Sequence, residues 1–394
     1  MEGKREVVIL SAVRTPLGSF GGSLASVPAP RLGATAIREA LKRANISGDE
    51  VDEVFMGNVL SAGVGQAPAR QAALFGGISQ ETPCTTVNKV CASGMKAIII
   101  GSQTIRLGEN RIVVAGGMES MSNVPHYLKG YRWGSKLGHG TLIDGLIHDG
   151  LWDVYNDMHM GSCTEVCIRE VGFSREEQDD YAEESYRRAE QAWKEGWFRE
   201  EVVPVEVETR KGKVLVDEDE EYKRVDFEKL RKLPPVFEKG GTITAGNAST
   251  INDGAAALVL ASGEEAERRG LRPVARIVGW ADAATDPVHF SLAPALAVQK
   301  LLDRTGWKKE DVEYWEINEA FAGVVLLNMK ELGITHERVN LYGGAVSLGH
   351  PIGCSGARIV VTLLSVLRNN GWKRGVAAIC NGGGGASALA VELL

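Results

Sequence analysis

The 394-residue sequence has no long apolar run, no run of Lys and Arg, and no Cys/His cluster spaced for a metal. Its hydrophobic stretches fall short of the roughly 18 residues that suggest a membrane helix, so we expect no membrane span. The net charge is -7 and no basic face is evident, which argues against nucleic acid as a partner. No Walker pattern or dinucleotide glycine fingerprint occurs. An anionic substrate would therefore have to be held by local groups.

The six cysteines are too few and too scattered for a disulfide framework, which indicates a reducing compartment. Cys163 and Cys167 have helical spacing but no nearby Cys/His cluster, so we expect no metal there. The first apolar strand, residues 7–10, starts almost at once and leaves no room for a signal or transit peptide. We therefore expect a cytoplasmic protein, or a mitochondrial matrix protein whose leader has been removed.

An internal duplication organises the chain. Residues 48–58 resemble 309–318, residues 93–98 resemble 355–360, and residues 114–117 resemble 379–382. All three pairs share nearly one separation, which indicates two copies of one supersecondary unit.

Each copy begins with an amphipathic helix pattern, at residues 32–41 and 296–302, followed by a short apolar strand. This order predicts βαβ halves with a mostly parallel, buried sheet. The intervening stretch is glycine-rich and then charged and helical, so it reads as an insertion. We predict a first half of residues 1–122 plus 250–270, an inserted loop domain of residues 123–249, and a second half of residues 271–394.

Cys91 lies at a predicted strand-to-helix transition, where free N–H groups and the helix dipole favour a thiolate. The alternative is a small buried hydrophobe, which is the usual fate of a free cysteine. His350 lies in a Gly- and Pro-rich loop before another helix, and such a histidine is often structural. The duplication, however, aligns Ser355 with Ser93, which should bring His350 towards Cys91 and place a base beside a nucleophile.

Two further polar residues end predicted strands. Cys380 precedes the glycine run 382–385, whose backbone N–H groups could approach an oxyanion. A second thiol could move a proton at the α-carbon of a thioester, although a core cysteine before a flexible turn is the alternative. Asn318 is either a turn residue or the holder of a water that donates to a thioester oxygen.

Two stretches suit a nucleotide thioester. Residues 245–249 could lie flat against an extended pantetheine arm, and Lys223 with Arg224 could meet phosphate or stack on adenine. Taken alone, the first is a loop and the second a solvated charge pair.

Six segments, in this order, resemble the thiolase family across nearly the whole chain. They are Ser11-Ala12-Val13-Arg14-Thr15-Pro16, Asn88-Lys89-Val90-Cys91-Ala92-Ser93-Gly94, Gly116-Gly117-Met118-Glu119-Ser120-Met121-Ser122, Asn318-Glu319-Ala320-Phe321, Gly349-His350-Pro351 and Cys380-Asn381-Gly382-Gly383-Gly384. The resemblance implies an α/β chain with the five-layered α-β-α-β-α thiolase fold, in which an inserted loop domain interrupts two pseudo-twofold-related βαβ halves.

The resemblance also implies an acetyl-CoA C-acetyltransferase that condenses two acetyl-CoA into acetoacetyl-CoA plus CoA, and reverses the reaction by thiolysis. Coenzyme A is then a substrate, and no cofactor is tightly bound. Cys91 would carry the acetyl group, His350 would activate it, and Cys380 would be the second acid/base. Asn318 would position a water of one oxyanion hole with His350, and the N–H groups of Cys91 and Gly382 would form the other. The implied CoA contacts are His159, Met160, Arg224, Val225, Asp226, Lys229, Ser249 and Phe321.

Within this family the chain is most similar to the mitochondrial acetoacetyl-CoA type, on residues 157–163, residues 220–227 and Asn381. That likeness implies a homotetramer built as a dimer of dimers, with a role in fatty-acid and ketone-body metabolism. It also implies a potassium ion bound by Tyr186 and the carbonyls of Ala245, Gly246, Ala248 and Val346. Residues 126–148 depart from the pattern, which leaves contacts between subunits open.

Two rival functions remain. A decarboxylating ketoacyl synthase of the same fold usually lacks a cysteine at position 380 and has a histidine near position 318. A non-catalytic acyl-CoA carrier would have lost the nucleophile. Because Cys91, His350, Cys380 and Asn318 are all present, the sequence favours the thiolase.

Overall fold

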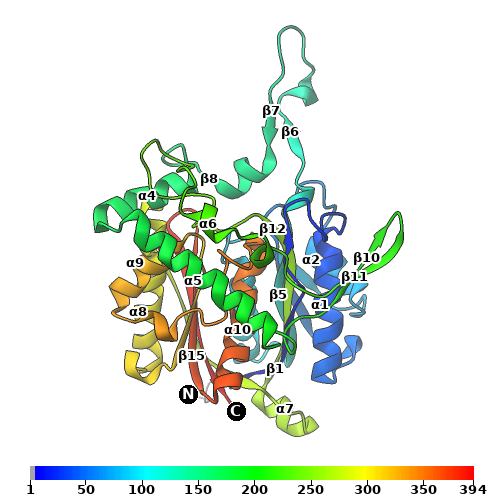
Figure 1. Cartoon of the computed structure of the whole chain (residues 1–394). Coiled ribbons are helices and arrows are strands. Elements are labelled where there is room, and N and C mark those ends of the chain that lie inside the picture. The colour runs from blue at the N-terminus through cyan, green and yellow to red at the C-terminus, as the bar shows by residue number, and fades with distance from the viewer. Residues whose placement is uncertain (1–4) are drawn as a thin grey trace.

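The computed structural model describes residues 5–394, so residues 1–4 of the predicted first half lie outside the described residues. The body of the protein contains two groups of strands and helices from opposite ends of the chain (Figure 1). The first group is β1 (Val7–Arg14), β2 (Gly18–Ser19), α1 (Ala29–Ala44), β3 (Glu53–Gly57), α2 (Pro68–Phe75), β4 (Cys84–Val87), α3 (Ser93–Leu107), β5 (Ile112–Ser120), β12 (Asn252–Ser262) and α7 (Gly263–Arg269). The second is β13 (Ala275–Ala284), α8 (Ala293–Thr305), β14 (Tyr314–Ile317), α9 (Ala322–Leu332), α10 (Ile352–Asn370), β15 (Arg374–Asn381) and β16 (Gly385–Leu393).

The main strands follow the order β14-β15-β16-β13-β1-β12-β5-β3-β4, with β2 beside β12. A short pairing of β1 with β13 joins the two half-sheets. The expectation of a mostly parallel sheet was wrong, because in residues 5–394 only β3–β4, β3–β5 and β14–β15 pair in parallel within this sheet. The reason lies in the connections: β15 turns directly back into β16, and β12 returns from the insertion antiparallel to β5.

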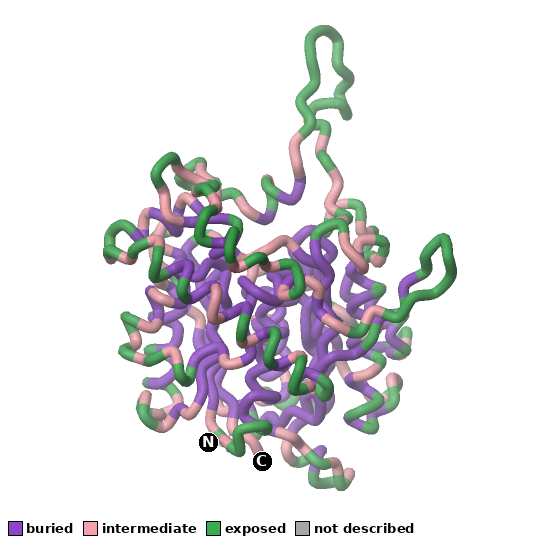
Figure 2. Tube along the Cα trace, in the orientation of Figure 1, coloured by how far each residue is buried: buried purple, intermediate pink, exposed green. Residues whose placement is uncertain are grey.

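The predicted five layers are confirmed. Helices α1 and α2 cover the outer face of the first half-sheet, and α8 and α9 cover that of the second. Helices α3 and α10 pack against each other between the half-sheets, inside the largest core cluster, and Figures 1 and 2 show α10 in the buried middle of the protein. Helix α10 is long and apolar, but 89% of its most apolar stretch is buried inside the protein, so the protein itself covers that surface.

The two central helices meet through glycine. A Cβ on Gly94 would lie 2.7 Å from the backbone nitrogen of Ala357, and one on Gly356 would lie 2.6 Å from that of Met95. These two contacts are exchanged by the predicted duplication, since Gly94 corresponds to Gly356 and Met95 to Ala357. The first turns of both helices therefore touch, which brings the loops that precede them to one place.

The intervening residues form smaller elements around this body. They are β6 (His126–Leu128), β7 (Leu142–Asp144), β8 (Trp152–Asp153), β9 (Met158–His159), α4 (Met160–Val171), α5 (Arg175–Lys194), β10 (Val205–Thr209), β11 (Gly212–Val216) and α6 (Phe227–Leu230). The β6–β7 and β10–β11 hairpins project from the body as exposed arms (Figures 1 and 2). Helix α5 begins at a capping box, in which Ser174 and Glu177 satisfy each other's backbone N–H. Its apolar face packs on the second half.

Candidate active site

Cys91 lies in the tight turn between β4 and α3. The preceding Val90 has φ of 47°, a left-handed conformation that is strained for a β-branched residue. Ser93 stabilises this turn, because its hydroxyl donates to the Val90 carbonyl at 2.6 Å and accepts the Lys89 N–H at 2.8 Å. The strained turn places Cys91 immediately before the helix, as the sequence predicted.

The protonation of Cys91 differs from expectation. Burial raises the pKa of this thiol to about 12, although the backbone N–H groups of Gly382 and Cys91 itself act to lower it. The nearby negative charge of Glu119 raises it further. Desolvation thus outweighs the helix terminus, and the expectation of a free thiolate was wrong. The thiol keeps its proton at neutral pH and needs a base to become a nucleophile.

His350 has the properties of such a base. Its backbone N–H donates to Asn252 Oδ1 at 2.9 Å, and its Nδ1 lies 2.6 Å from Ser355 Oγ. Because the Ser355 hydroxyl donates its one proton to the Pro351 carbonyl at 3.0 Å, its oxygen accepts from Nδ1–H. The neutral ring then has its lone pair on Nε2, which has no partner among the described residues. Burial, together with the charge of Arg358, lowers the pKa of His350 to about 3, so the ring is neutral at physiological pH.

The second thiol ends β15. Cys380 is fully buried, and burial together with the neighbouring Cys91 raises its pKa well above the usual value. The chain then turns through Gly383 and Gly384, which both have φ of 82°. This turn directs the Gly382 N–H at Cys91. The two thiols and a backbone donor are therefore close together.

Asn318 follows β14, the parallel neighbour of β15. Its backbone N–H donates to Ala378 at 2.9 Å, but both polar atoms of its buried side chain have no partner in residues 5–394. Asn381 Oδ1 is also buried and unpaired. Buried polar atoms are normally paired, so the unpaired atoms of Asn318, His350 and Asn381 indicate groups that await a substrate or water.

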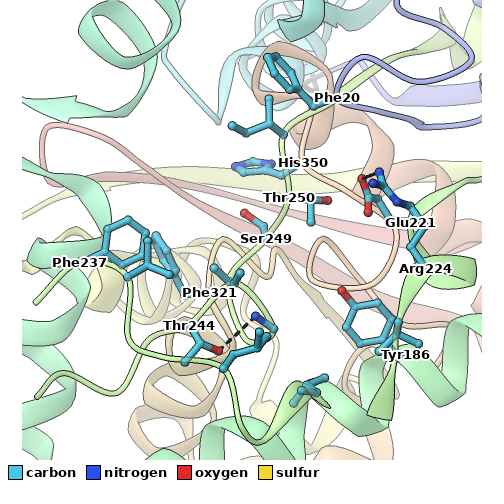
Figure 3. Close-up of a pocket in the computed structure, with 18 of the residues that line it drawn as sticks. Phe20, Tyr186, Glu221, Arg224, Phe237, Thr244, Ser249, Thr250, Phe321 and His350 are labelled. Atoms are coloured by element: carbon cyan, nitrogen blue, oxygen red, sulfur yellow. Dashed lines mark hydrogen bonds and ion pairs between the residues drawn. The ribbon is translucent and has the colours of Figure 1, made fainter. Parts of the chain in front are cut away.

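A cleft of about 760 Å³ leads towards these residues (Figure 3). His350 and Ile352 line its inner part, and the aromatic rings of Phe237 and Phe321 form one side. The lining includes all the predicted CoA contacts except Met160, namely His159, Arg224, Val225, Asp226, Lys229, Ser249 and Phe321. Met160 instead lies behind the cleft, with its sulfur near Gly382. Cys91, Cys380, Gly382 and Asn318 are likewise not among the lining residues.

Sequence reasoning missed several residues of this cleft. Phe237 stacks on His159 with ring centroids 4.6 Å apart and meets Phe321 edge-on at 5.8 Å. Phe20 also lines the cleft, and Figure 3 shows it on the same side as His350. The available signal is an aromatic residue two positions after Pro235, in a loop that returns to the body of the protein. Ser355 served in the sequence only to align the halves, and its contact with His350 depends on the helix geometry.

The residues predicted to bind potassium come together at the same cleft. Tyr186, Ala245, Gly246 and Ala248 line it, whereas Val346 is buried nearby. In the described part of the chain, no hydrogen bond is accepted by the carbonyls of Ala245, Gly246, Ala248 or Val346. Unclaimed carbonyl oxygens suit a hard monovalent cation, so these residues fit the ion. Across residues 5–394 no cluster of three His, Cys, Asp or Glu side chains offers a different metal site.

Nearly the whole chain is similar to known proteins. Residues 7–264 match the model of the thiolase N-terminal domain, and residues 271–393 match that of the thiolase C-terminal domain. The chain is 58% identical to acetyl-CoA acetyltransferase 2 of Arabidopsis thaliana, over 99% of this chain and 98% of that protein. It is 56% identical to the mitochondrial acetyl-CoA acetyltransferase of Mus musculus, over 99% of this chain and 91% of that protein.

Solved structures agree. The Acat5 thiolase from Ascaris suum, in complex with coenzyme A, is similar with a TM-score of 0.94 and 50% identity, covering 99% of this chain and all of that one. The Bacillus anthracis acetyl-CoA acetyltransferase gives a TM-score of 0.98 at 42% identity, covering both chains fully.

The duplicated five-layered body and these relatives define the class of this protein, an acyltransferase. Within that class, the chain belongs to the thiolase family.

Proposed function

We propose that this protein is an acetyl-CoA acetyltransferase, which condenses two acetyl-CoA into acetoacetyl-CoA and CoA and catalyses the reverse thiolysis. One observation carries the proposal: His350, whose Nε2 is unpaired, lines a cleft of about 760 Å³, and the thiols of Cys91 and Cys380 lie close together near the backbone N–H of Gly382. The names of the relatives support the same substrates. Coenzyme A is a substrate here, and no step requires a tightly bound cofactor.

In the degradative direction, His350 Nε2 takes the proton from Cys91, and the thiolate attacks the 3-keto carbon of acetoacetyl-CoA. The N–H groups of Cys91 and Gly382 stabilise the resulting oxyanion. When the carbon–carbon bond breaks, His350 Nε2–H and a water held by Asn318 donate to the enolate oxygen. Cys380 then protonates the α-carbon, and acetyl-CoA leaves.

The second half of the reaction restores the enzyme. The Cys380 thiolate takes the proton of the CoA thiol, and the CoA sulfur attacks the acetyl group on Cys91. Collapse of the tetrahedral intermediate releases a second acetyl-CoA. His350 returns the proton to Cys91, so protons and thiols balance over the cycle.

The test is thiolysis of acetoacetyl-CoA combined with intact-mass and peptide analysis after brief exposure to acetyl-CoA. Turnover with one acetyl group on Cys91 is expected. An acetyl group on another cysteine, or no turnover, would overturn the proposal.

Rates with 2-methylacetoacetyl-CoA and a longer 3-ketoacyl-CoA would define the substrate range, and with it the proposed role in fatty-acid or ketone-body metabolism. Fractionation of cells would separate the two proposed locations, the cytoplasm and the mitochondrial matrix.

We propose potassium as a structural activator. Tyr186 and the carbonyls of Ala245, Gly246, Ala248 and Val346 would hold the ion, which supplies charge compensation for these oxygens when bound. The same segment contains Ser249, which lines the cleft. A stiffened segment lowers the entropy lost when pantetheine becomes ordered in the cleft.

We also propose a homotetramer, a dimer of dimers, with contacts made by the β6–β7 arm. Its tip exposes Trp133 and Leu137 at 86% and 99%, which is unusual for apolar side chains of a monomer. Mass photometry should find tetramers that dissociate in the double variant Trp133→Ser/Leu137→Ser. Leu215→Ser on the other exposed arm is the matched control and should leave the mass unchanged. A wild-type protein that is monomeric at micromolar concentration would contradict the proposal.

A further inference from the structure

A buried carboxylate without a counter-ion lies where the two halves meet. Glu119, near the end of β5, has no exposed surface, and it forms no ion pair with a cation among residues 5–394. Its two oxygens accept four hydrogen bonds. The donors are Asn58 Nδ2 at 2.7 Å, Val59 N at 3.0 Å, Leu60 N at 3.2 Å and Gly353 N at 2.9 Å. One carboxylate thus connects the loop after β3 with the helix α10.

The contact with α10 replaces a missing cap. The helix is preceded by Pro351, whose side chain cannot accept a hydrogen bond from the first turn. The Gly353 N–H is one of the donors that a helix leaves unpaired, and a carboxylate there also interacts favourably with the helix dipole. A Cβ on residue 353 would lie 2.6 Å from Glu119 Oε2 and 2.7 Å from the Met118 carbonyl oxygen, so glycine is needed for this close approach.

The same carboxylate shapes the surroundings of Cys91. Val59 and Leu60, whose N–H groups it accepts, pack in one cluster with Ile352 of α10, and Cys91 packs against that cluster. His350 lies two residues before Ile352. A shift of Glu119 would therefore move the wall beside the nucleophile together with the segment that contains the base.

We propose that Glu119 is a positioning residue for acyl transfer, whose carboxylate holds the first turn of α10, and with it His350, against the loop that borders Cys91. This inference rests on the function proposed above. It assigns to a first-half residue the task of placing the second-half base.

The charge of Glu119 affects the pH dependence of Cys91 alkylation, which a purely structural role would leave unchanged. Burial raises the pKa of Glu119 to about 7, against the effect of three backbone N–H groups, and Asp253 of β12 raises it further. The other titratable groups that it faces are the thiols of Cys91 and of Cys354 on α10. Above pH 7 the ionised carboxylate opposes ionisation of Cys91, so removal of this charge lowers the pKa of Cys91. Below pH 7 Glu119 is protonated and the effect fades.

The test is Glu119→Gln in the full chain, with thiolysis kinetics and the rate at which iodoacetamide alkylates Cys91 measured between about pH 6 and pH 9. We expect kcat to fall about 100-fold because His350 is displaced, with little change in KM for CoA. We expect Cys91 to be alkylated about 3- to 10-fold faster than in the wild type above pH 7, and equally fast near pH 6.

Two further variants separate geometry from charge. Gly353→Ala crowds the carboxylate and the Met118 carbonyl but keeps the charge of Glu119, so kcat should fall without faster alkylation. Glu165→Gln removes a different buried carboxylate, which accepts the N–H groups of Thr242 and Ile243 at 2.7 Å, and should leave alkylation of Cys91 unchanged. Circular dichroism checks folding of each variant.

An unchanged kcat in Glu119→Gln, or alkylation no faster than in the wild type above pH 7, would overturn the inference. If that variant does not fold, Gly353→Ala decides, and an unchanged kcat there overturns it. Failure of acetyl-CoA to acetylate wild-type Cys91 would instead contradict the proposed function, so the two failures are distinguishable.

Discussion

Asn58 and Asn318 end equivalent strands, β3 and β14, yet their side chains are used in opposite ways. Asn58 donates to the Met118 carbonyl and to Glu119, and accepts from Ser61. Asn318 is just as buried, but neither of its side-chain polar atoms has a partner among residues 5–394. The first half uses its asparagine in a hydrogen-bond network, whereas the equivalent side chain of the second half remains unpaired, as the role proposed for Asn318 requires. The two halves therefore share one backbone arrangement, but the side chains at this equivalent position differ in their hydrogen bonding.

The two thiols also occupy positions at which the two halves differ. Cys91 has Gly353 at the equivalent place in the second half, and Cys380 has Ala115 at the equivalent place in the first. Each half therefore contributes one thiol, at a different point of the shared frame. Substitutions should distinguish the residues that act in catalysis from those that only stabilise the fold, and their expected effects range from very large to a few-fold.

The largest effect is expected for Cys91→Ala. Thiolysis should fall by about 10⁴- to 10⁶-fold, because no other group can take the acetyl. Cys354→Ala is the matched control, since Cys354 is a buried cysteine in the first turn of α10. It should change thiolysis by less than about tenfold, with a modest loss of stability. Similar losses in both variants would break the distinction between the nucleophile and a core cysteine.

Cys380→Ser should lose thiolysis by about 10²- to 10⁴-fold, because proton transfer at the α-carbon is impaired. It should still accept an acetyl group on Cys91, as measured by intact mass after brief exposure to acetyl-CoA. His350→Ala should lose both steps, because the protonated Cys91 then has no base. If both variants failed equally to acylate, the separate roles of these residues would be wrong.

The pair Asn318→Ala and Asn58→Ala tests the opening comparison directly. Asn318→Ala should lower kcat by about 10- to 1000-fold, with little change in the free energy of unfolding, since its polar atoms have no partners to lose. Asn58→Ala should destabilise the protein by about 1–3 kcal/mol, because Glu119 and the Met118 carbonyl lose a buried donor. Urea unfolding and thiolysis kinetics measure the two effects. The comparison fails if Asn318→Ala is the more destabilised of the two.

The smallest effect concerns potassium. Thiolysis should be a few-fold faster in potassium than in sodium at equal ionic strength, because an ordered segment 245–249 lowers the entropy lost on binding. Tyr186→Phe should remove most of this difference. Tyr342→Phe, at a buried tyrosine that pairs with Asn369, should retain it. Equal rates in both salts for the wild-type protein would contradict a functional ion.

Much of the fold was predictable because the duplication and the helical periodicities are visible in the chain. Residues 32–41 and 296–302 lie within α1 and α8, and the register that aligns Gly94 with Gly356 reappears as a reciprocal contact. The direction of the strands was not predictable. Whether β12 runs parallel or antiparallel to β5 depends on how the long insertion crosses the body, and no local pattern encodes that path.

The sequence by itself determined the family, the shared frame and the identity of the candidate residues, because motifs and hydrophobic spacing are local properties. Only the tertiary structure decided how those residues are protonated and which of them remain free. The raised pKa of the Cys91 thiol, the Nε2 lone pair of His350 and the unpaired side chain of Asn318 all depend on burial and on partners far away in sequence. Glu119 shows this most clearly, because its role depends on a backbone N–H that lies 234 residues further along the chain. Desolvation and long-range hydrogen bonds arise only when distant segments pack, so a linear reading cannot supply them.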